Sequence, residues 1–224
     1  MRKAARRTVG KNVLTRFCLV RHGETPWNAE LRLQGHIDVP LNDTGRRQAA
    51  ATARVLSAHR FDALYSSDLA RALQTAAAAA SACGLQPLPH SGLRERHYGV
   101  LQGRTYDEAE AQHPEVWRHF KGRNPAYSFP GGGESLAEFD ARVRQAMDAI
   151  LRAHTGQTVL VVTHGGVLDI IHRLASGKPL EAARDFAIPN AALNWIAHDA
   201  QGWRLECWAD QTHLGSSMDE LPHP

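Results

Sequence analysis

The sequence is poor in cysteine and has no long apolar run. Its 224 residues include three cysteines, Cys18, Cys83 and Cys207, and no C-x-x-C pair. This excludes a disulfide-stabilised scaffold, and unpaired thiols are typical of a reducing compartment, so we predict a cytoplasmic protein. No window holds about 18 consecutive apolar residues, which excludes a typical membrane-spanning helix. We therefore expect no membrane partner.

The chain also lacks the residue spacings that bind metals. It contains 13 histidines but neither a His-x-His nor an H-E-x-x-H motif. We predict no metal site, and we interpret most of the histidines as surface or packing residues. This group consists of His36, His59, His113, His119, His154, His172, His198, His213 and His223.

The positive net charge of +3 is concentrated at the N-terminus. Residues 1–16 hold six basic side chains and no acidic one, so the rest of the chain is slightly acidic. We predict a disordered basic tail over residues 1–16, although a weak transit peptide has a similar composition. No aromatic residue interleaves with these charges, and we expect no nucleic-acid partner. The remainder is predicted as one domain over 17–210, followed by a polar C-terminal tail over 211–224.

Short apolar runs alternate with amphipathic segments along this domain. Three runs are typical of strands buried on both faces of a sheet: residues 17–20, 61–65 and 158–162. Three segments have helical periodicity: residues 44–58, 68–82 and 134–154. We expect the Ser66-Ser67-Asp68 turn to cap the second helix. The alternation predicts a three-layer α/β fold with a mostly parallel central sheet and helices on both faces.

Two further strands are predicted near the C-terminus, at residues 193–198 and 203–208, around an Asp199-Ala200-Gln201-Gly202 turn. We interpret them as a hairpin at the edge of the sheet, with Trp203, Leu205 and Cys207 on one face. An unpaired edge is a place for contact with a second copy, so a homodimer is possible here.

Polar side chains follow three of the predicted strands directly. Arg21 and His22 follow the first strand, Ser66 to Arg71 follow the second, and His164 follows the third. In open α/β sheets, ligands bind beyond the carboxyl ends of the strands, where helix N-termini also favour anions. Guanidinium groups bind phosphate oxygens in a forked geometry. The sequence therefore predicts a phosphate site at this edge.

Such a site has the groups for phosphoryl transfer. A histidine next to phosphate can attack phosphorus and form a phosphohistidine, while Arg21, Arg71 and His164 neutralise the charge on the phosphoryl oxygens. The departing alkoxide needs a proton, and Glu95 is the candidate acid if its pKa is raised.

The sequence resembles the histidine phosphatase superfamily, in the branch that contains the cofactor-dependent phosphoglycerate mutases. The resemblance extends from about Phe17 to Trp208 and rests on six short motifs in family order. These are Arg21-His22-Gly23-Glu24-Thr25-x-Trp27-Asn28, Leu33-Gln34-Gly35 with Pro40-Leu41, Tyr65-Ser66-Ser67-Asp68-Leu69-x-Arg71-Ala72, Glu95-Arg96-x-Tyr98-Gly99, Gly132-Gly133-Glu134-Ser135 and Thr163-His164-Gly165-Gly166.

The resemblance implies a phosphoglycerate mutase-like fold and a role for each matching residue. His22 corresponds to the nucleophile, Glu95 to the proton donor, and Arg21, Arg71 and His164 to the phosphate pocket. The positions expected to line the phosphate and the substrate are Gly23, Thr25, Asn28, Gln34, Gly35, Arg96, His97, Tyr98 and Gly165. The family resemblance implies no metal and no organic cofactor for a phosphatase.

The motifs do not separate hydrolysis from phosphoryl transfer, because both pass through the same phosphohistidine. We favour a phosphomonoesterase for a small phosphorylated metabolite, since the middle segment is shorter than in phosphoglycerate mutases. A mutase primed by 2,3-bisphosphoglycerate is the alternative, with Arg104, Arg118 and Arg123 as the possible partners of a second phosphate. A non-catalytic phosphate-binding regulatory module is a third reading. We further consider residues 117–123 either a solvated loop or a lid.

Overall fold

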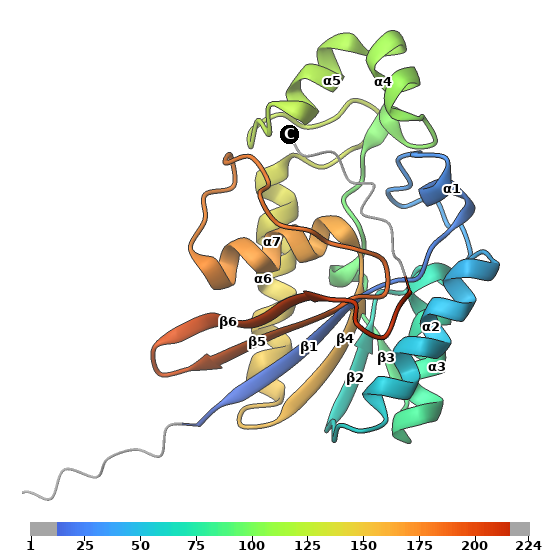
Figure 1. Ribbon diagram of the computed structural model, residues 1–224. Coiled ribbons are helices and arrows are strands. Elements are labelled where there is room, and N and C mark those ends of the chain that lie inside the picture. Colours follow the sequence, from blue (N-terminus) through green and yellow to red (C-terminus); the bar gives the residue numbers. More distant parts are fainter. Residues whose placement is uncertain (1–12, 216–224) are drawn as a thin grey trace, which may run out of the picture.

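The computed structural model describes residues 13–215, so most of the predicted basic tail and of the predicted C-terminal tail lies outside the described residues. One six-stranded sheet, in the order β3-β2-β4-β1-β5-β6, forms the centre of the molecule (Figure 1). In chain order its strands are β1 (Thr15–Arg21), β2 (Ala63–Ser66), β3 (Pro87–Pro89), β4 (Thr158–Thr163), β5 (Leu193–Asp199) and β6 (Gly202–Asp210). β1 to β4 pair in parallel, and β5 and β6 are antiparallel.

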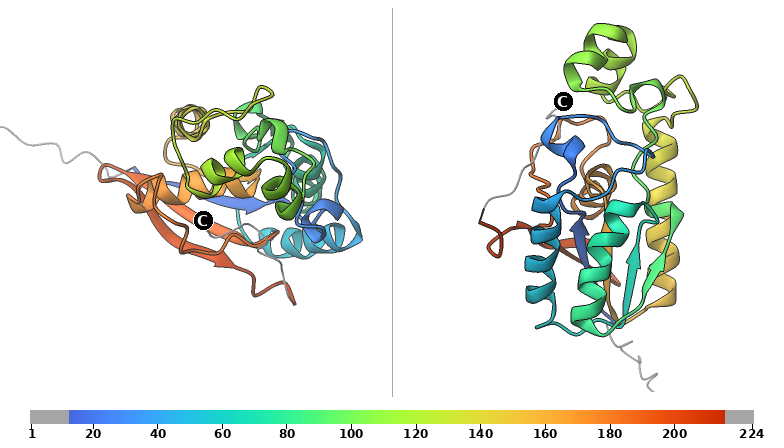
Figure 2. Two further views of the ribbon diagram at one scale, coloured as in Figure 1. Left: turned by 90° about the horizontal axis from the view of Figure 1, so that it is seen from above. Right: turned by 90° about the vertical axis from the view of Figure 1, so that its right-hand side faces the viewer.

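Helices cover both faces of the sheet, which confirms the predicted three-layer fold (Figure 2). On one face, Phe17 and Leu19 of β1 pack with α6 (Leu136–Ala153) and α7 (Gly165–Ser176). On the other face, Cys18 and Val20 pack with α2 (Asp43–Leu56) and α3 (Ala70–Cys83). A strand with apolar side chains on both faces must be covered on both, and each fully buried side chain contributes about 1.5–3 kcal/mol.

The predicted cap of α3 is wrong. Asp68 instead accepts two hydrogen bonds from Arg94, both 2.7 Å long. The first turn of α3 is capped from a distant loop, where Asp38 Oδ1 accepts the N–H of Ala70 at 2.7 Å. In contrast, α6 begins with a local capping box, in which Oγ of Ser135 accepts the N–H of Glu138 and the Glu138 carboxylate accepts the N–H of Ser135. A cap supplied from elsewhere in the chain has no local sequence signal.

The C-terminal hairpin differs from the prediction in two ways. Of the two hairpin strands, only β6 lies at an edge of the sheet, because β5 pairs with β1 as well as with β6. The register also shifts between the Trp195–Cys207 and Ile196–Leu205 pairs. Such a shift moves the following side chains to the opposite face. Cys207 is consequently exposed, whereas Trp203 and Leu205 pack against the core together with Trp208.

Between β3 and α6 the chain forms a small helical cap above the carboxyl ends of the strands (Figure 2). It contains two 3-10 turns, Ser91–Leu93 and Gly99–Leu101, followed by α4 (Tyr106–Gln112) and α5 (Pro114–Lys121). Its own apolar cluster includes Trp117, which is buried, so this segment is not a solvated loop. No helix in the described part of the chain is long and apolar enough to cross a membrane.

Candidate active site

The carboxyl ends of β1, β2 and β4 meet beneath the cap, and the predicted polar residues gather there. One cavity at this edge is lined by residues from the strand ends, the loop after α1 (Pro26–Ala29) and the cap: Arg21, His22, Asn28, Arg32, Leu33, Gln34, Gly35, Arg71, Glu95, Tyr98 and Tyr106. His164, at the end of β4, lies beside it, with its ring edge to face with that of His22 and the centroids 5.1 Å apart. The convergence follows from the parallel strands, whose carboxyl ends share one edge.

His22 is held as a neutral imidazole. Its Nδ1 lies 2.7 Å from the carbonyl oxygen of Gly23, which can only accept, so Nδ1 carries the hydrogen and Nε2 keeps its lone pair. Burial and the charges of Arg71 and Arg21 hold the pKa of His22 well below its usual range. The side-chain amide of Asn190 anchors the carbonyl of His22 at 3.0 Å. The ring is therefore oriented by two backbone contacts, and the lone pair of its Nε2 is available.

Arg71 provides one of the two buried positive charges of the site, beside Arg21. Its Nη1 and Nη2 donate to the carbonyl oxygens of Ile37 and Gly35 at 3.0 and 2.8 Å, and its Nε donates to Nδ1 of His164 at 3.2 Å. Burial lowers the pKa of Arg71 to about 10, so the guanidinium stays charged at neutral pH. The ring of His164 then donates from Nε2 to Oγ of Ser67 at 2.7 Å. We did not predict Ser67 as a site residue, although its motif pointed to this turn.

Glu95 lies at the N-terminus of α7 with a buried side chain. Its two carboxylate oxygens accept the backbone N–H groups of Arg96 at 2.8 Å and Gly166 at 2.9 Å. Burial raises the pKa of Glu95, and the two N–H groups and the charges of Arg71 and Arg21 offset part of that rise. Gly166 permits this approach, because a Cβ there would lie 2.1 Å from Oε1 of Glu95. A buried carboxyl with a raised pKa is suited to donate a proton.

Several of the predicted lining residues act through the backbone or through packing. The hydrogen bonds of Thr25 cap α1, where its side chain accepts the N–H of Asn28 at 3.1 Å. Gly23 is packed against α2, since a Cβ would lie 2.4 Å from the carbonyl oxygen of Gly45. Gly165 is the first residue of α7 and is not part of the cavity lining.

Two other predicted residues, Arg96 and His97, also lie outside the lining. Arg96 turns away and donates from Nε and Nη2 to the carbonyl oxygen of Glu134 at 3.1 and 2.9 Å, with its guanidinium over Phe129. The N–H of His97 donates to Oε2 of Glu134 at 2.9 Å. Of the predicted set, Asn28, Gln34, Gly35 and Tyr98 do line the cavity.

The lining also contains two residues that sequence reasoning missed, Arg32 in the loop after α1 and Tyr106 in α4. The Nη1 atom of Arg32 donates to Glu108 at 2.9 Å, and its Nε donates to Glu30 at 3.1 Å. Neither residue falls within a motif that we recognised, and the local sequence offers no other signal for their position. Within residues 13–215, no group of three or more His, Cys, Asp or Glu side chains is arranged to hold a metal ion.

Comparisons with known proteins agree with this geometry. The model of the histidine phosphatase superfamily (branch 1) matches residues 17–211. This chain belongs to that superfamily. It is 41% identical over 199 residues to phosphoglycerate mutase-like protein 4 of Arabidopsis thaliana, covering 88% of this chain and 85% of the relative. It is 39% identical over 205 residues to the metal-independent phosphoserine phosphatase of the same plant, covering 91% and 84%.

A solved structure, YhfR of Bacillus stearothermophilus, superposes with a TM-score of 0.82 at 32% identity, covering 89% of this chain and 98% of that one. The likeness therefore extends over most of both chains. As a member of the histidine phosphatase superfamily, the chain has the family fold, and its relatives include phosphatases of small phosphorylated metabolites and proteins named as phosphoglycerate mutases.

Proposed function

We propose that this chain is a phosphomonoesterase that hydrolyses a small phosphorylated metabolite through a covalent phosphohistidine at His22. The observation that carries the proposal is the pairing of two buried groups in one cavity: a neutral His22 and a Glu95 whose pKa is raised. The lowered pKa favours the neutral ring of His22, and the raised pKa favours the protonated form of Glu95, which are the forms that the first step requires. The name of the phosphoserine phosphatase relative supports hydrolysis of a small substrate.

In the first step, Nε2 of His22 attacks phosphorus, and the bond between phosphorus and the ester oxygen breaks. Arg21 and Arg71 stabilise the charge on the phosphoryl oxygens, and Glu95 gives its proton to the departing alkoxide. In the second step, the Glu95 carboxylate takes a proton from water as the water oxygen bonds to phosphorus. The phosphorus–nitrogen bond then breaks, which releases inorganic phosphate and restores both residues.

The cavity lining contains one buried hydrogen-bond acceptor that a donor group of the substrate could satisfy. Oε1 of Gln34 is buried and has no hydrogen-bond partner among the described residues. A buried amide oxygen without a partner is costly, which favours a substrate that donates to it from a hydroxyl or ammonium group.

Hydrolysis is favoured over mutase activity because Arg32, the lining arginine other than Arg21 and Arg71, is already paired with carboxylates. A mutase binds a bisphosphate and needs further positive charge for the second phosphate. Arg32 is paired with Glu30 and Glu108, and Arg94 is paired with Asp68. Such pairs leave little positive potential for another phosphate.

The arginines expected to bind that second phosphate lie elsewhere. Arg123 donates to Asp169 at 2.6 Å and to the carbonyl oxygen of Leu180 at 2.6 Å, with its side chain 11% exposed. Arg118 lies 3.9 Å from Glu115 on the exposed face of α5. Arg104, like these two, is not part of the cavity lining.

The test compares 4-nitrophenyl phosphate with 3-phosphoglycerate in the presence of EDTA. His22→Ala serves as the active-site variant, and His59→Ala, an exposed histidine outside the cavity lining, is the matched control. We expect hydrolysis of the aryl phosphate that falls at least about 10³-fold in His22→Ala and is unchanged in the control. Rapid conversion of 3-phosphoglycerate to 2-phosphoglycerate after priming would establish the mutase instead. Phosphate binding with no turnover and no acid-labile phosphoprotein would establish the regulatory module.

A further inference from the structure

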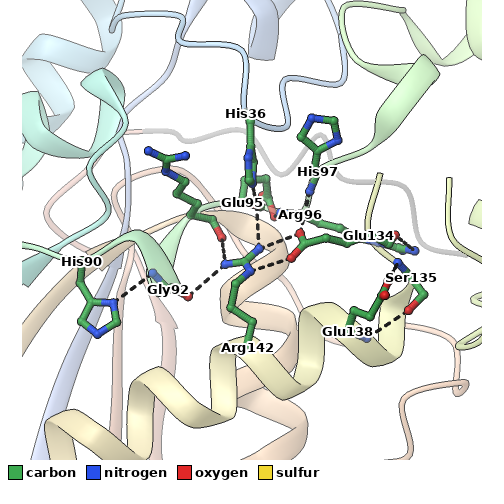
Figure 3. Close-up of polar contacts among 11 residues, drawn as sticks. His36, His90, Gly92, Glu95, Arg96, His97, Glu134, Ser135, Glu138 and Arg142 are labelled. Carbon is green, nitrogen blue, oxygen red and sulfur yellow. Dashed lines mark hydrogen bonds and ion pairs between the residues drawn. The ribbon is translucent and has the colours of Figure 1, made fainter. Parts of the chain in front are cut away.

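Arg142, in the second turn of α6, divides its five N–H groups between Glu134 and the segment that carries Glu95 (Figure 3). Nε and Nη2 bind the two carboxylate oxygens of Glu134, each at 2.7 Å. The other three N–H groups bind backbone carbonyl oxygens: those of Gly92 and Arg94 at 3.0 Å and that of Glu95 at 3.1 Å. One side chain therefore holds three carbonyl groups of the segment 92–95, which ends at the proton donor Glu95.

The segment depends on such contacts because it has no regular structure of its own. Residues 94–98 belong to no helix or strand. Their carbonyl groups must then find partners outside regular structure: those of His97 and Tyr98 accept backbone N–H groups, whereas those of Arg94 and Glu95 accept from side chains. Nε2 of His36 lies 2.7 Å from the Glu95 carbonyl oxygen, and Oγ1 of Thr163 donates to the Leu93 carbonyl oxygen at 2.8 Å. Arg142 makes more of these contacts than either.

We propose that Arg142 is a positioning residue that sets the orientation of Glu95 for proton transfer and touches no reacting atom itself. The inference rests on the function proposed above. The carboxyl group of Glu95 is oriented by the N–H of Gly166, which belongs to α7. This orientation is kept only while the main chain of Glu95 stays at a fixed distance from α7. A shift of about 1 Å in a catalytic group can cost about 10²-fold in rate.

Glu134 keeps this contact stable across the working pH range. Its burial opposes ionisation, but the hydrogen bonds from Arg142 and from the His97 N–H prevail, so the pKa of Glu134 is lowered. The ion pair therefore persists to acidic pH. The carboxylate also compensates the charge of Arg142, and it fixes the guanidinium plane that the three carbonyl groups require.

Lysine cannot replace this arrangement. An ammonium group on a flexible stem can pair with Glu134, but it has three donors and no fork, so it cannot bind both carboxylate oxygens and three carbonyl groups together. Arg142→Lys thus keeps the charge and removes the geometry. Arg144→Lys is the matched control, because Arg144 lies on the same helix and its Nε contacts Asp140 at 2.8 and 2.7 Å on the surface.

The experiment measures kcat/KM for phenyl phosphate and 2,4-dinitrophenyl phosphate, two aryl esters whose leaving phenols differ strongly in acidity. The phenolate leaves poorly and needs the proton of Glu95, whereas dinitrophenolate leaves without one. In Arg142→Lys we expect kcat/KM to fall about 10²-fold for phenyl phosphate and less than about 5-fold for the dinitrophenyl ester. Arg144→Lys should leave both values, and hence their ratio, unchanged.

An equal loss for both substrates in a folded Arg142→Lys protein, or no loss for either, would overturn the positioning role. Failure of the proposed function looks different, because the wild-type protein would then hydrolyse neither ester or would hydrolyse both without His22. If Arg142→Lys does not fold, as judged by circular dichroism, Glu134→Gln provides the same test with a nearly unchanged side-chain shape. This substitution weakens the two hydrogen bonds between Arg142 and residue 134, and we expect the same selective loss of kcat/KM for phenyl phosphate.

Discussion

His22 and His164 face each other edge to face, with ring centroids 5.1 Å apart, and their hydrogen bonds require opposite tautomers. His22 carries its hydrogen on Nδ1, which faces a carbonyl oxygen, so its Nε2 is a free base. In His164, Nδ1 accepts from Arg71, so the hydrogen lies on Nε2. Burial and the charge of Arg71 lower the pKa of both rings well below the usual range. Two chemically identical side chains are thereby assigned different roles by their neighbours.

The pH profile of kcat/KM should have its optimum on the acidic side of neutrality. Glu95 must be protonated in the first step, and burial raises its pKa, so activity falls as pH rises through that raised value. His22 must be neutral, and its lowered pKa moves the acidic limb to low pH. In Glu95→Gln, kcat/KM for phenyl phosphate should fall about 10²–10⁴-fold and the alkaline limb should disappear. An unchanged alkaline limb in this variant would assign the proton to another group.

Gly166→Ala should impair catalysis while the protein remains folded. The added Cβ would lie 2.1 Å from Oε1 of Glu95, so the carboxyl must move from its position at the α7 N-terminus. We expect kcat/KM for phenyl phosphate to fall about 10²-fold. Gly215→Ala, where a Cβ meets nothing within 4 Å, is the control and should behave as wild type. Full activity in Gly166→Ala would show that the observed placement of Glu95 is not needed.

Glu108→Gln should make the cavity bind anions more tightly. Glu108 pairs with Arg32, which lines the cavity, at 2.9 Å. Removing the negative charge leaves Arg32 with Glu30 as its remaining acidic partner and raises the local positive potential. We expect 2,3-bisphosphoglycerate to inhibit the variant several-fold more strongly, with inorganic phosphate affected less. Inhibition constants measured at low salt check this, and equal constants for the two proteins would contradict it.

Asp38→Ala should lower the free energy of unfolding by about 1 kcal/mol, because the Asp38 carboxylate caps the first N–H of α3. Urea denaturation monitored by circular dichroism measures this. Asp148→Ala, an exposed position within α6, serves as the control and should cost less than about 0.5 kcal/mol. Since Arg71 lies in the same first turn of α3, we also expect KM to rise in Asp38→Ala.

The sequence by itself determined the layered α/β fold and the chemistry of the strand ends. Phe17 to Val20 is apolar at every position, so this strand had to be covered on both faces, and His22 had to lie just beyond it. These properties depend on local patterns, on the periodicity of apolar side chains and on the direction in which parallel strands end.

Only the tertiary structure decided which side chains meet across the chain. The cap of α3 by Asp38, the salt bridges of Arg32, the approach of Gly166 to Glu95 and the contacts of Arg142 with three carbonyl groups all join segments that are distant in sequence. The same is true of the register shift that exposes Cys207. A hydrogen bond or a close contact depends on distances of a few tenths of an ångström, and only the packing of the whole fold determines those.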